Sequence, residues 1–486
     1  MKRVILLAIG FSLSIQPSVN AQTPGDTLWT RVFGGAGHDT GWCVDQTSDQ
    51  GFILSGWTTS FGSGSYDVYL IRTDAAGDTV WTKSYARDGS DDARCVRQTP
   101  DGGFVVAGNT QPIGIFGSYV WLLKTDALGD TLWTRRWGEV PIPEINTGRC
   151  VQPTSDGGYI ISGHQQAPSE DMYLIKTYAN GDTDWTRSFG GAGYEIGYWV
   201  EQTSDLGYIC VGYTMSFGHG NEDVFLVKID ASGNLDWMKA HGGPGTDSGF
   251  SVQQTSDDGY IIAGFTDSFG AGSYDAYLIR TDAAGDTVWT RTYGGTNYDK
   301  GYAVDILPND SFIVSGTTRS FGESSGDVYL LKLDSFGDIL WSRTYGTDSE
   351  EKGWSVQATN DGNYIVSGYT AGYGTTDAYL LKVFGEEAAD IISDDAMIAG
   401  GRGSLQSYPN PCKAGAVIEF TLPYAQQAEL IIYDIMGREV AALAHGHCES
   451  GLHRVPFDGS NLGSGIYLYV LKTEGKQLVR QMLLVQ

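Results

Sequence analysis

Basic residues are scarce in this sequence. Its 486 residues include 31 Lys and Arg against 58 Asp and Glu, which gives a formal net charge of −27 at pH 7. A surface this acidic repels phosphate backbones, so the composition argues against nucleic acid as a partner. Long apolar runs are also missing after residue 21, where none approaches the roughly 18 residues that a membrane helix needs. We therefore expect no transmembrane helix in the mature chain.

Cysteine is equally sparse, with six residues. Cys43, Cys95 and Cys150 each stand directly before a valine at the same position of a repeat, so they should lie on neighbouring structural units and too far apart for a disulfide. We interpret them as small buried apolar residues, and Cys210 in the same way. The remaining two either pair with each other or stay free, and they are Cys412 and Cys448.

The N-terminus has the pattern of a secretory signal peptide. Residues 1–21, MKRVILLAIGFSLSIQPSVNA, combine two basic residues, an apolar run and small residues at Val19 and Ala21. We expect cleavage after Ala21 and a mature protein that is secreted or exposed at the cell surface.

A tryptophan recurs every 52 residues through most of the chain. The stretch YDAYLIRTDAAGDTVWTRTYGG at 274–295 shows the repeated unit most clearly. A fixed period of this size is typical of a repeat array, and periods of about 40–50 residues favour propeller blades. The column consists of Trp29, Trp81, Trp133, Trp185, Trp237, Trp289 and Trp341.

Each unit contains four short strand candidates joined in pairs by turns rich in Asp and Gly. In the second unit they span 93–99, 103–110, 119–126 and 131–137. The chain begins with a fourth strand at 25–33, and the array ends with a third strand at 377–382. If the N-terminal strand completes the last unit, the ring closes without a long free edge. We therefore predict an all-β fold with a seven-bladed β-propeller over residues 22–384.

The strand order resembles kelch repeats and the secreted SBBP propeller repeats. In those families a strand like GYIISG (158–163) precedes a D-x-Y-L-I-K strand, here DMYLIK (171–176), and then a turn that leads to tryptophan. The resemblance covers residues 24–384 and implies the propeller fold, which by itself says little about activity. This chain differs in that the kelch double glycine is mostly a single residue, as at Gly56 and Gly264.

A different domain follows an acidic, repeat-free linker predicted at residues 385–404. Short alternating strands with Gly and Pro punctuation predict a small β-sandwich over residues 405–486. Its motifs resemble the C-terminal sorting domain of type IX secretion cargo: YPNP (408–411), YD with GR (433–438) and GIY (465–467). The resemblance implies a two-membrane bacterium, passage across both membranes and the type IX secretion machinery as a partner of residues 405–486.

Two columns of residues are candidates for ligand binding on the face that carries the long loops. Five positions before the valine of each first strand stands a carboxylate or amide, and these residues predict a ring at the channel mouth that binds a cation or a polyhydroxylated ligand. They are Asp39, Asp91, Asn146, Glu195, Asp247, Asp299 and Glu351. The alternative is that each side chain caps backbone N–H groups or pairs with a base of its own blade.

The second column lies two positions before the same valines and is mostly aromatic. It consists of Trp42, Tyr198, Phe250, Tyr302 and Trp354, with Arg94 and Arg149 in the remaining two units. Aromatic rings near acids and amides suit sugar stacking, but packing between blades requires them as well. The repeated tryptophans, each followed two positions later by Lys or Arg, are interpreted as structural, with the cation stacked on the ring.

Metal and cofactor signals are weak. The turns TDAAGD at 73–78 and 281–286 suggest calcium, but two carboxylates four residues apart are more simply turn formers. The one dense histidine cluster lies in the C-terminal domain and consists of His445, His447, Cys448 and His453. We therefore predict no cofactor and no metal site, with calcium as the alternative.

Catalysis is also not indicated. Residues 66–82 and 274–290 differ only at Val68 against Ala276, whereas an active site needs several different groups at one place. We predict an exported binding protein, not an enzyme, with a surface protein or polysaccharide as ligand. The alternatives are a propeller enzyme acting on glycans, a quinone-dependent dehydrogenase, and a purely structural surface-layer protein. The third unit departs most from the repeat, at 138–148 and 164–171, and is the hypothetical source of specificity.

Overall fold

The computed structural model describes residues 23–385, except 64, 88, 115–116, 139–144, 167–168, 323–324 and 373–374. It also describes residues 397–484, except 399–400, 403–404, 409–411, 414, 423–424, 435–437, 464 and 474–475. The expected signal peptide and most of the expected linker lie outside these residues. The chain divides into two compact units, Met1–Glu386 and Glu387–Gln486, and each is described by itself.

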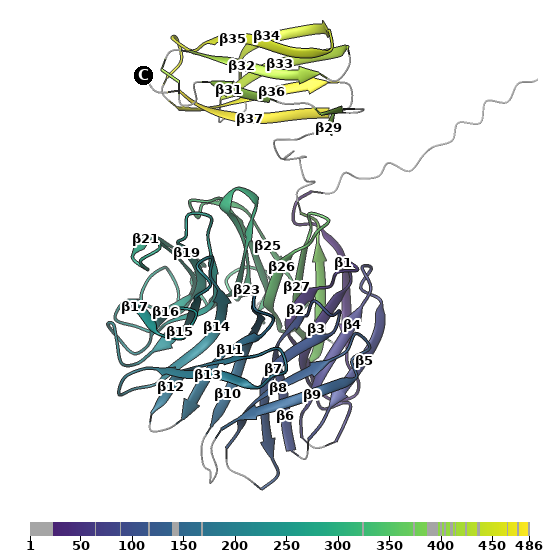
Figure 1. Ribbon diagram of the computed structural model, residues 1–486, viewed down its shortest axis with the longest axis vertical. Helices are drawn as coiled ribbons and strands as arrows, with labels where there is room; N and C mark the ends of the chain where they lie inside the picture. Colours follow the sequence, from purple (N-terminus) through teal and green to yellow (C-terminus); the bar gives the residue numbers. More distant parts are fainter. Residues whose placement is uncertain are drawn as a thin grey trace, which may run out of the picture. The chain divides into compact units, whose positions relative to one another are not determined.

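The described part of the first unit forms seven four-stranded antiparallel sheets, which confirms the predicted propeller (Figure 1). Blade 1 contains β2 (Asp39–Gln46), β3 (Phe52–Thr58), β4 (Asp67–Thr73) and β5 (Thr79–Tyr85). Blade 2 contains β6 (Gly89–Gln98), β7 (Phe104–Pro112), β8 (Tyr119–Thr125) and β9 (Thr131–Trp137). Blade 3 contains β10 (Asn146–Pro153), β11 (Tyr159–Gln166), β12 (Glu170–Thr177) and β13 (Thr183–Phe189).

The remaining blades repeat this order. Blade 4 contains β14 (Glu195–Gln202), β15 (Tyr208–Thr214), β16 (Asp223–Ile229) and β17 (Leu235–His241). Blade 5 contains β18 (Asp247–Gln254), β19 (Tyr260–Thr266), β20 (Asp275–Thr281) and β21 (Thr287–Tyr293). Blade 6 contains β22 (Asp299–Leu307), the 3-10 turn η1 (Pro308–Asp310), β23 (Ser311–Thr318), β24 (Asp327–Leu333) and β25 (Ile339–Tyr345).

Blade 7 combines the two ends of the array. It contains β26 (Glu351–Ala358), β27 (Tyr364–Thr370), β28 (Asp377–Val383) and, as its outer strand, β1 (Thr27–Phe33). β1 pairs antiparallel with β28, and in Figure 1 it lies beside the strands of the last blade. Backbone hydrogen bonds from Gly25 N to Phe384 O (2.9 Å) and from Phe384 N to Asp26 O (2.8 Å) continue the pairing beyond the strand. The predicted closure of the ring by the N-terminal strand is therefore confirmed.

The tryptophan column joins each blade to the next. Trp29 of β1 meets Phe52 of blade 1 edge-on with 6.0 Å between ring centroids, and the other six tryptophans contact the equivalent aromatic residue of the following blade. Arg31 lies over Trp29 and forms an ion pair with Asp78 of the next blade at 3.0 Å. Dispersion between rings and a shared cation thus hold adjacent outer edges together.

Buried basic residues in the third strands stabilise the turns between the first two strands. The Nζ of Lys176, which is 2% exposed, lies 2.8 Å from a carboxylate oxygen of Asp156. Burial alone would raise the pKa of Asp156, but hydrogen bonds from Lys176 and Thr154 outweigh it and lower the pKa to about 2. At the TDAAGD turn, Asp74 Oδ1 accepts hydrogen bonds from the backbone N–H groups of Ala76 and Asp78, the role of a turn former.

The second unit contains two packed sheets in its described part. One consists of β31 (Leu405–Tyr408), β32 (Gly415–Leu422) and β35 (Gly451–Asp458). The other consists of β34 (Glu439–Cys448), β33 (Gln426–Asp434), β36 (Gly465–Thr473) and β37 (Lys476–Leu484), and β29 (Met397–Ile398) pairs separately with β30 (Gly401–Arg402). Side chains of both sheets form one apolar core. This confirms the predicted small β-domain.

The cysteines and histidines of the second unit are dispersed in the structure. Cys412 is buried, Cys448 is half-buried, and both are free thiols. His445 Nδ1 lies 2.7 Å from a carboxylate oxygen of Glu429, and the His453 ring stacks on Phe420. Among the residues placed by the structure, no group of three or more His, Cys, Asp or Glu is arranged to hold a metal ion. No described helix is long and apolar enough to span a membrane.

Two adjacent residues of β1 test the closure of the ring. Phe33 is 8% exposed and belongs to the core between blades 7 and 1, whereas Val32 is 37% exposed. Phe33→Ala should cost about 3–5 kcal/mol of the free energy of unfolding, because it leaves a cavity in that core. Val32→Ala should cost less than about 1 kcal/mol. Thermal and urea unfolding measure both, and equal effects would mean that β1 is not docked as the fold requires.

Candidate functional site

A β-bulge in every inner strand turns one side chain toward the centre of the propeller. The register of the inner pair shifts at one residue in each blade, for example between Gly41 and Cys43 in blade 1. The bulged residue is the one two positions before the inner-strand valine. These residues line one cavity of about 90 Å³, and we call them the collar: Trp42, Arg94, Arg149, Tyr198, Phe250, Tyr302 and Trp354.

The collar is held by stacking between neighbouring blades. Trp354 has Trp42 on one side, with 4.7 Å between ring centroids, and Tyr302 on the other at 4.2 Å. Phe250 stacks on Tyr198 with 4.3 Å between centroids and meets Tyr302 edge-on at 5.3 Å. Because neighbours cover the ring faces, a ligand in the cavity meets mainly ring edges, which carry partial positive charge. The aromatic collar residues thus pack between blades, the role given above as the alternative to sugar stacking.

The predicted column of carboxylates and one amide is buried behind the loops. Asp39 is fully buried, and its Oδ2 accepts hydrogen bonds from Gly35 N at 2.8 Å and Ser60 Oγ at 2.6 Å. The equivalent side chains of the other blades are 0–2% exposed: Asp91, Asn146, Glu195, Asp247, Asp299 and Glu351. The five acids among them accept backbone N–H groups of their own preceding loops. Their placement differs from the open ring that we expected at the channel mouth, and it matches the capping alternative.

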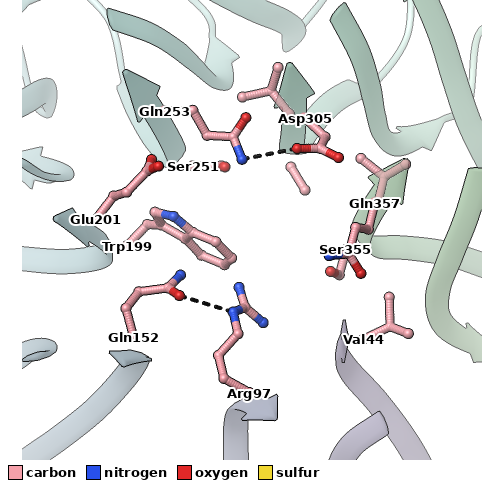
Figure 2. A pocket seen from close by; sticks show the side chains of 13 residues that line it. Val44, Arg97, Gln152, Trp199, Glu201, Ser251, Gln253, Asp305, Ser355 and Gln357 are labelled. Atoms are coloured by element: carbon pink, nitrogen blue, oxygen red, sulfur yellow. Dashed lines mark hydrogen bonds between the residues drawn. The ribbon is translucent and has the colours of Figure 1, made fainter. Parts of the chain in front are cut away.

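A ring of polar side chains lies deeper in the channel, one position after each inner-strand valine. We call it the polar ring: Asp45, Arg97, Gln152, Glu201, Gln253, Asp305 and Gln357. Six of the seven line a cavity of about 160 Å³ enclosed by the seven inner strands. Figure 2 shows these side chains pointing into one space from strands on all sides of it.

The polar ring also joins the blades. Asp45 Oδ2 accepts the backbone N–H of Gln98 in the next blade at 2.8 Å, and Asp305 Oδ2 accepts that of Ala358 at 2.7 Å. Gln253 and Gln357 make the same contact through their amide oxygens. A side-chain oxygen at this position therefore replaces a missing strand partner, which explains why every blade but one carries Asp, Glu or Gln there.

The exception lies between blades 2 and 3. Arg97 has no oxygen to accept a hydrogen bond, and the residue that would donate the N–H is Pro153, which has none. Arg97 instead donates from Nε to Gln152 Oε1 at 3.1 Å and lies over Trp199 at 5.0 Å (Figure 2). Arg97 thus replaces the acceptor at the joint where Pro153 removes the donor. No backbone N–H is left unpaired there, and one guanidinium faces the channel.

Trp199 separates the two cavities. The equivalent residue of the other blades is Cys, Ser or Ala, so Trp199 is the one large side chain at its level. It lines both the upper cavity within the collar and the lower cavity within the polar ring, as do Ala303 and Ser355. The channel thus consists of an apolar, arginine-containing entrance and a polar chamber.

Unpartnered polar atoms remain in the lower chamber. Glu201 Oε2 and Ser251 Oγ are buried without a hydrogen-bond partner among the described residues. Burial and, secondarily, the charge of Asp305 raise the pKa of Glu201 to about 8. Burial also raises the pKa of Asp305, although the hydrogen bond from Ala358 N acts to lower it. At neutral pH the Glu201 carboxyl is therefore mostly protonated and can donate as well as accept a hydrogen bond.

Sequence reasoning located the collar and missed the polar ring. The signal for the ring was present: a column of inward-pointing residues, all polar, that differ from blade to blade. Because its members are Asp, Arg, Gln or Glu, the ring does not form a column of one residue type as the tryptophans do. The irregular third unit falls partly on residues 139–144 and 167–168, which lie outside the described residues.

Comparison with known families identifies the second unit. Residues 406–486 match the family described as the secretion system C-terminal sorting domain, which confirms the resemblance stated above. The protein is therefore delivered by the type IX secretion system to the cell surface or the extracellular space.

Other relatives are distant. The regulatory protein FlaEY of Caulobacter vibrioides is 27% identical over 188 residues, which are 36% of this chain and 17% of that protein. The chain thus spans less than a fifth of the length of this curated relative. PorZ, a surface component of the type IX secretion system of Porphyromonas gingivalis, is 12% identical with a TM-score of 0.43, covering 93% of this chain and 60% of its own. A periplasmic gluconolactonase of Pseudomonas aeruginosa is 12% identical with a TM-score of 0.42, covering 83% and 98%.

The state of Glu201 should be visible in the pH dependence of stability. Its folded pKa of about 8 exceeds the unfolded value of about 4.3. The folded state therefore binds the proton more tightly, and this contribution is fully present below pH ~4.3 and lost as the pH rises to 8. Glu201→Gln lacks this contribution. The melting temperature of the wild type minus that of Glu201→Gln should fall between pH 4.5 and 8, and a constant difference would contradict a buried, protonated Glu201.

Proposed function

We propose that this protein is an exported binding protein without catalytic activity, and that its propeller captures a polyhydroxylated ligand in the channel. The ligand is a short oligosaccharide or the end of a polysaccharide outside the cell. Delivery by type IX secretion supports the location, and the polar chamber beneath the collar supports the class of ligand.

The observation that carries the proposal is the pair of unpartnered atoms in the lower chamber. A buried polar atom without a partner costs about 1–3 kcal/mol, so Glu201 Oε2 and Ser251 Oγ both favour occupation of the chamber by a polar group. A sugar hydroxyl donates one hydrogen bond and accepts others, which suits a chamber that offers Gln amides, a guanidinium and carboxyl groups together.

Hydrolysis of a glycan is the second candidate function. Glu201 and Asp305 are two carboxyl groups on different blades, and the raised pKa of Glu201 gives one of them the protonated form that a general acid needs. Against this role, Asp305 already binds Ala358 N at 2.7 Å and Gln253 Nε2 at 3.0 Å, so its oxygens serve the join between blades. Binding is therefore the better supported function.

The test is a screen of the purified full chain against neutral and acidic glycans, with analysis of the products. Binding without turnover is expected.

Ser251→Ala removes the free hydroxyl from the chamber and should weaken binding about tenfold, the equivalent of one hydrogen bond of ~1.4 kcal/mol. Ser188→Ala makes the same chemical change on the exposed outer strand of blade 3 and should leave affinity unchanged.

The outcomes of this screen separate the two functions. Products that disappear in Glu201→Gln would favour hydrolysis in the chamber over simple capture. If Ser251→Ala and Glu201→Gln both bind glycan as tightly as the wild type, the site lies outside the channel. That result would contradict the proposal.

A further inference from the structure

The collar is interrupted at one place by two arginines on adjacent blades. Arg94 belongs to β6 and Arg149 to β10, and the other five collar members are aromatic. Arg94 lies over the ring of Trp42 at 4.5 Å, and Arg149 lies over the ring of Tyr198 at 4.6 Å. Both guanidinium groups thus use a face for stacking, and the N–H edge of Arg149 remains available, whereas Nε and Nη2 of Arg94 donate to Asp92.

Positive charge at this place exceeds the negative charge that faces it. Arg94 forms an ion pair with Asp92 at 2.9 Å. Arg149 has no hydrogen bond or ion pair to any residue that the structure describes, and its Nε is buried without a partner. The nearby ring of His164 is neutral, because burial and then the charges of Arg149 and Arg94 lower its pKa to about 3, so it changes neither sum. Two guanidinium groups therefore lie near a single carboxylate, that of Asp92, which pairs with Arg94.

A half-buried guanidinium whose Nε is buried without a partner is costly, and an anion is the group that relieves the cost. A carboxylate, like a phosphate, matches the planar fork of arginine with two parallel hydrogen bonds, and a carboxylate is the anion that a sugar itself carries when it is a uronic acid. The collar cavity shares Trp199, Ala303 and Ser355 with the polar chamber, so a carboxylate held at the collar lies next to groups suited to hydroxyls.

We propose that Arg149 and Arg94 bind the carboxylate of a uronic acid residue, whose hydroxyl groups then enter the polar chamber. The proposal rests on the function proposed above and specifies the class of its ligand. The ligand is short, because a chain with a net charge of −27 disfavours a long polyanion. A single uronate or the uronate end of an oligosaccharide meets both conditions.

The experiment is isothermal titration of the full chain with galacturonate and glucuronate, each compared with its neutral counterpart, galactose or glucose. The acidic sugar should bind at least tenfold more tightly than the neutral sugar at low salt, and salt should reduce the difference. Propionate and a peptide with a free C-terminus are included as carboxylates that lack hydroxyl groups. Both should bind at least tenfold more weakly than the uronate.

Arginine variants locate the effect. Arg149→Gln should remove the preference for the acidic sugar while leaving the weaker binding of the neutral sugar in place, and Arg94→Gln should reduce the preference in part. Arg136→Gln is the matched control, because Arg136 stacks on Tyr119 at 5.0 Å in the same way but lies on the exposed outer strand β9. Its loss changes the net charge equally and should not change the preference.

The outcomes distinguish this proposal from the function on which it rests. Neutral and acidic sugars that bind wild type equally would refute the arginine site and leave the sugar-binding channel intact. Binding of no sugar would refute the proposed function itself. Propionate or peptide binding as tight as uronate binding would show that carboxylates of another source are the ligand. A preference that Arg136→Gln lowers as much as Arg149→Gln does would show general electrostatics instead of a site.

Discussion

Everything in the propeller depends on closure of the ring by β1. Each blade covers both faces of its sheet only with a neighbour on either side, and the last blade is complete only when the N-terminal strand pairs with β28. The same requirement explains the repeated contacts: tryptophans and cations join the outer edges, and side-chain oxygens of the polar ring join the inner edges. A closed ring with seven inner strands necessarily has a channel. The channel is therefore a consequence of the closure.

The proposed binding site lies where the repeat is broken. Residues that serve packing are nearly the same in every blade, as the tryptophan column shows, whereas the residues around the channel differ from blade to blade. The pairing of Arg97 with Pro153 is informative, because an arginine replaces the acceptor at the one joint where a proline has removed the donor. Arg94 and Arg149 interrupt the aromatic collar in the same two blades, and Trp199 in blade 4 divides the channel. Asymmetry in a symmetric ring thus concentrates different groups at one place.

The architecture could be predicted from the sequence because period and strand count are direct consequences of blade geometry. A 52-residue tryptophan column, a lone fourth strand at the start and a lone third strand at the end permit one closed arrangement. The site could be predicted only in part. The collar residues were identified, but the bulge that turns them inward leaves no mark in the pattern. The acids such as Asp39 were expected at the mouth and lie buried, because loop N–H groups bind them, and loop conformation does not follow from strand periodicity.

We propose that a polyhydroxylated ligand occupies this channel, with its carboxylate at the arginine pair. A crystal structure of the full chain grown with galacturonate tests this most directly. The account predicts the sugar within hydrogen-bond distance of the Arg149 guanidinium, with hydroxyl groups near Ser251 and Glu201. Galacturonate bound elsewhere on the propeller, with the channel filled only by water, would contradict it.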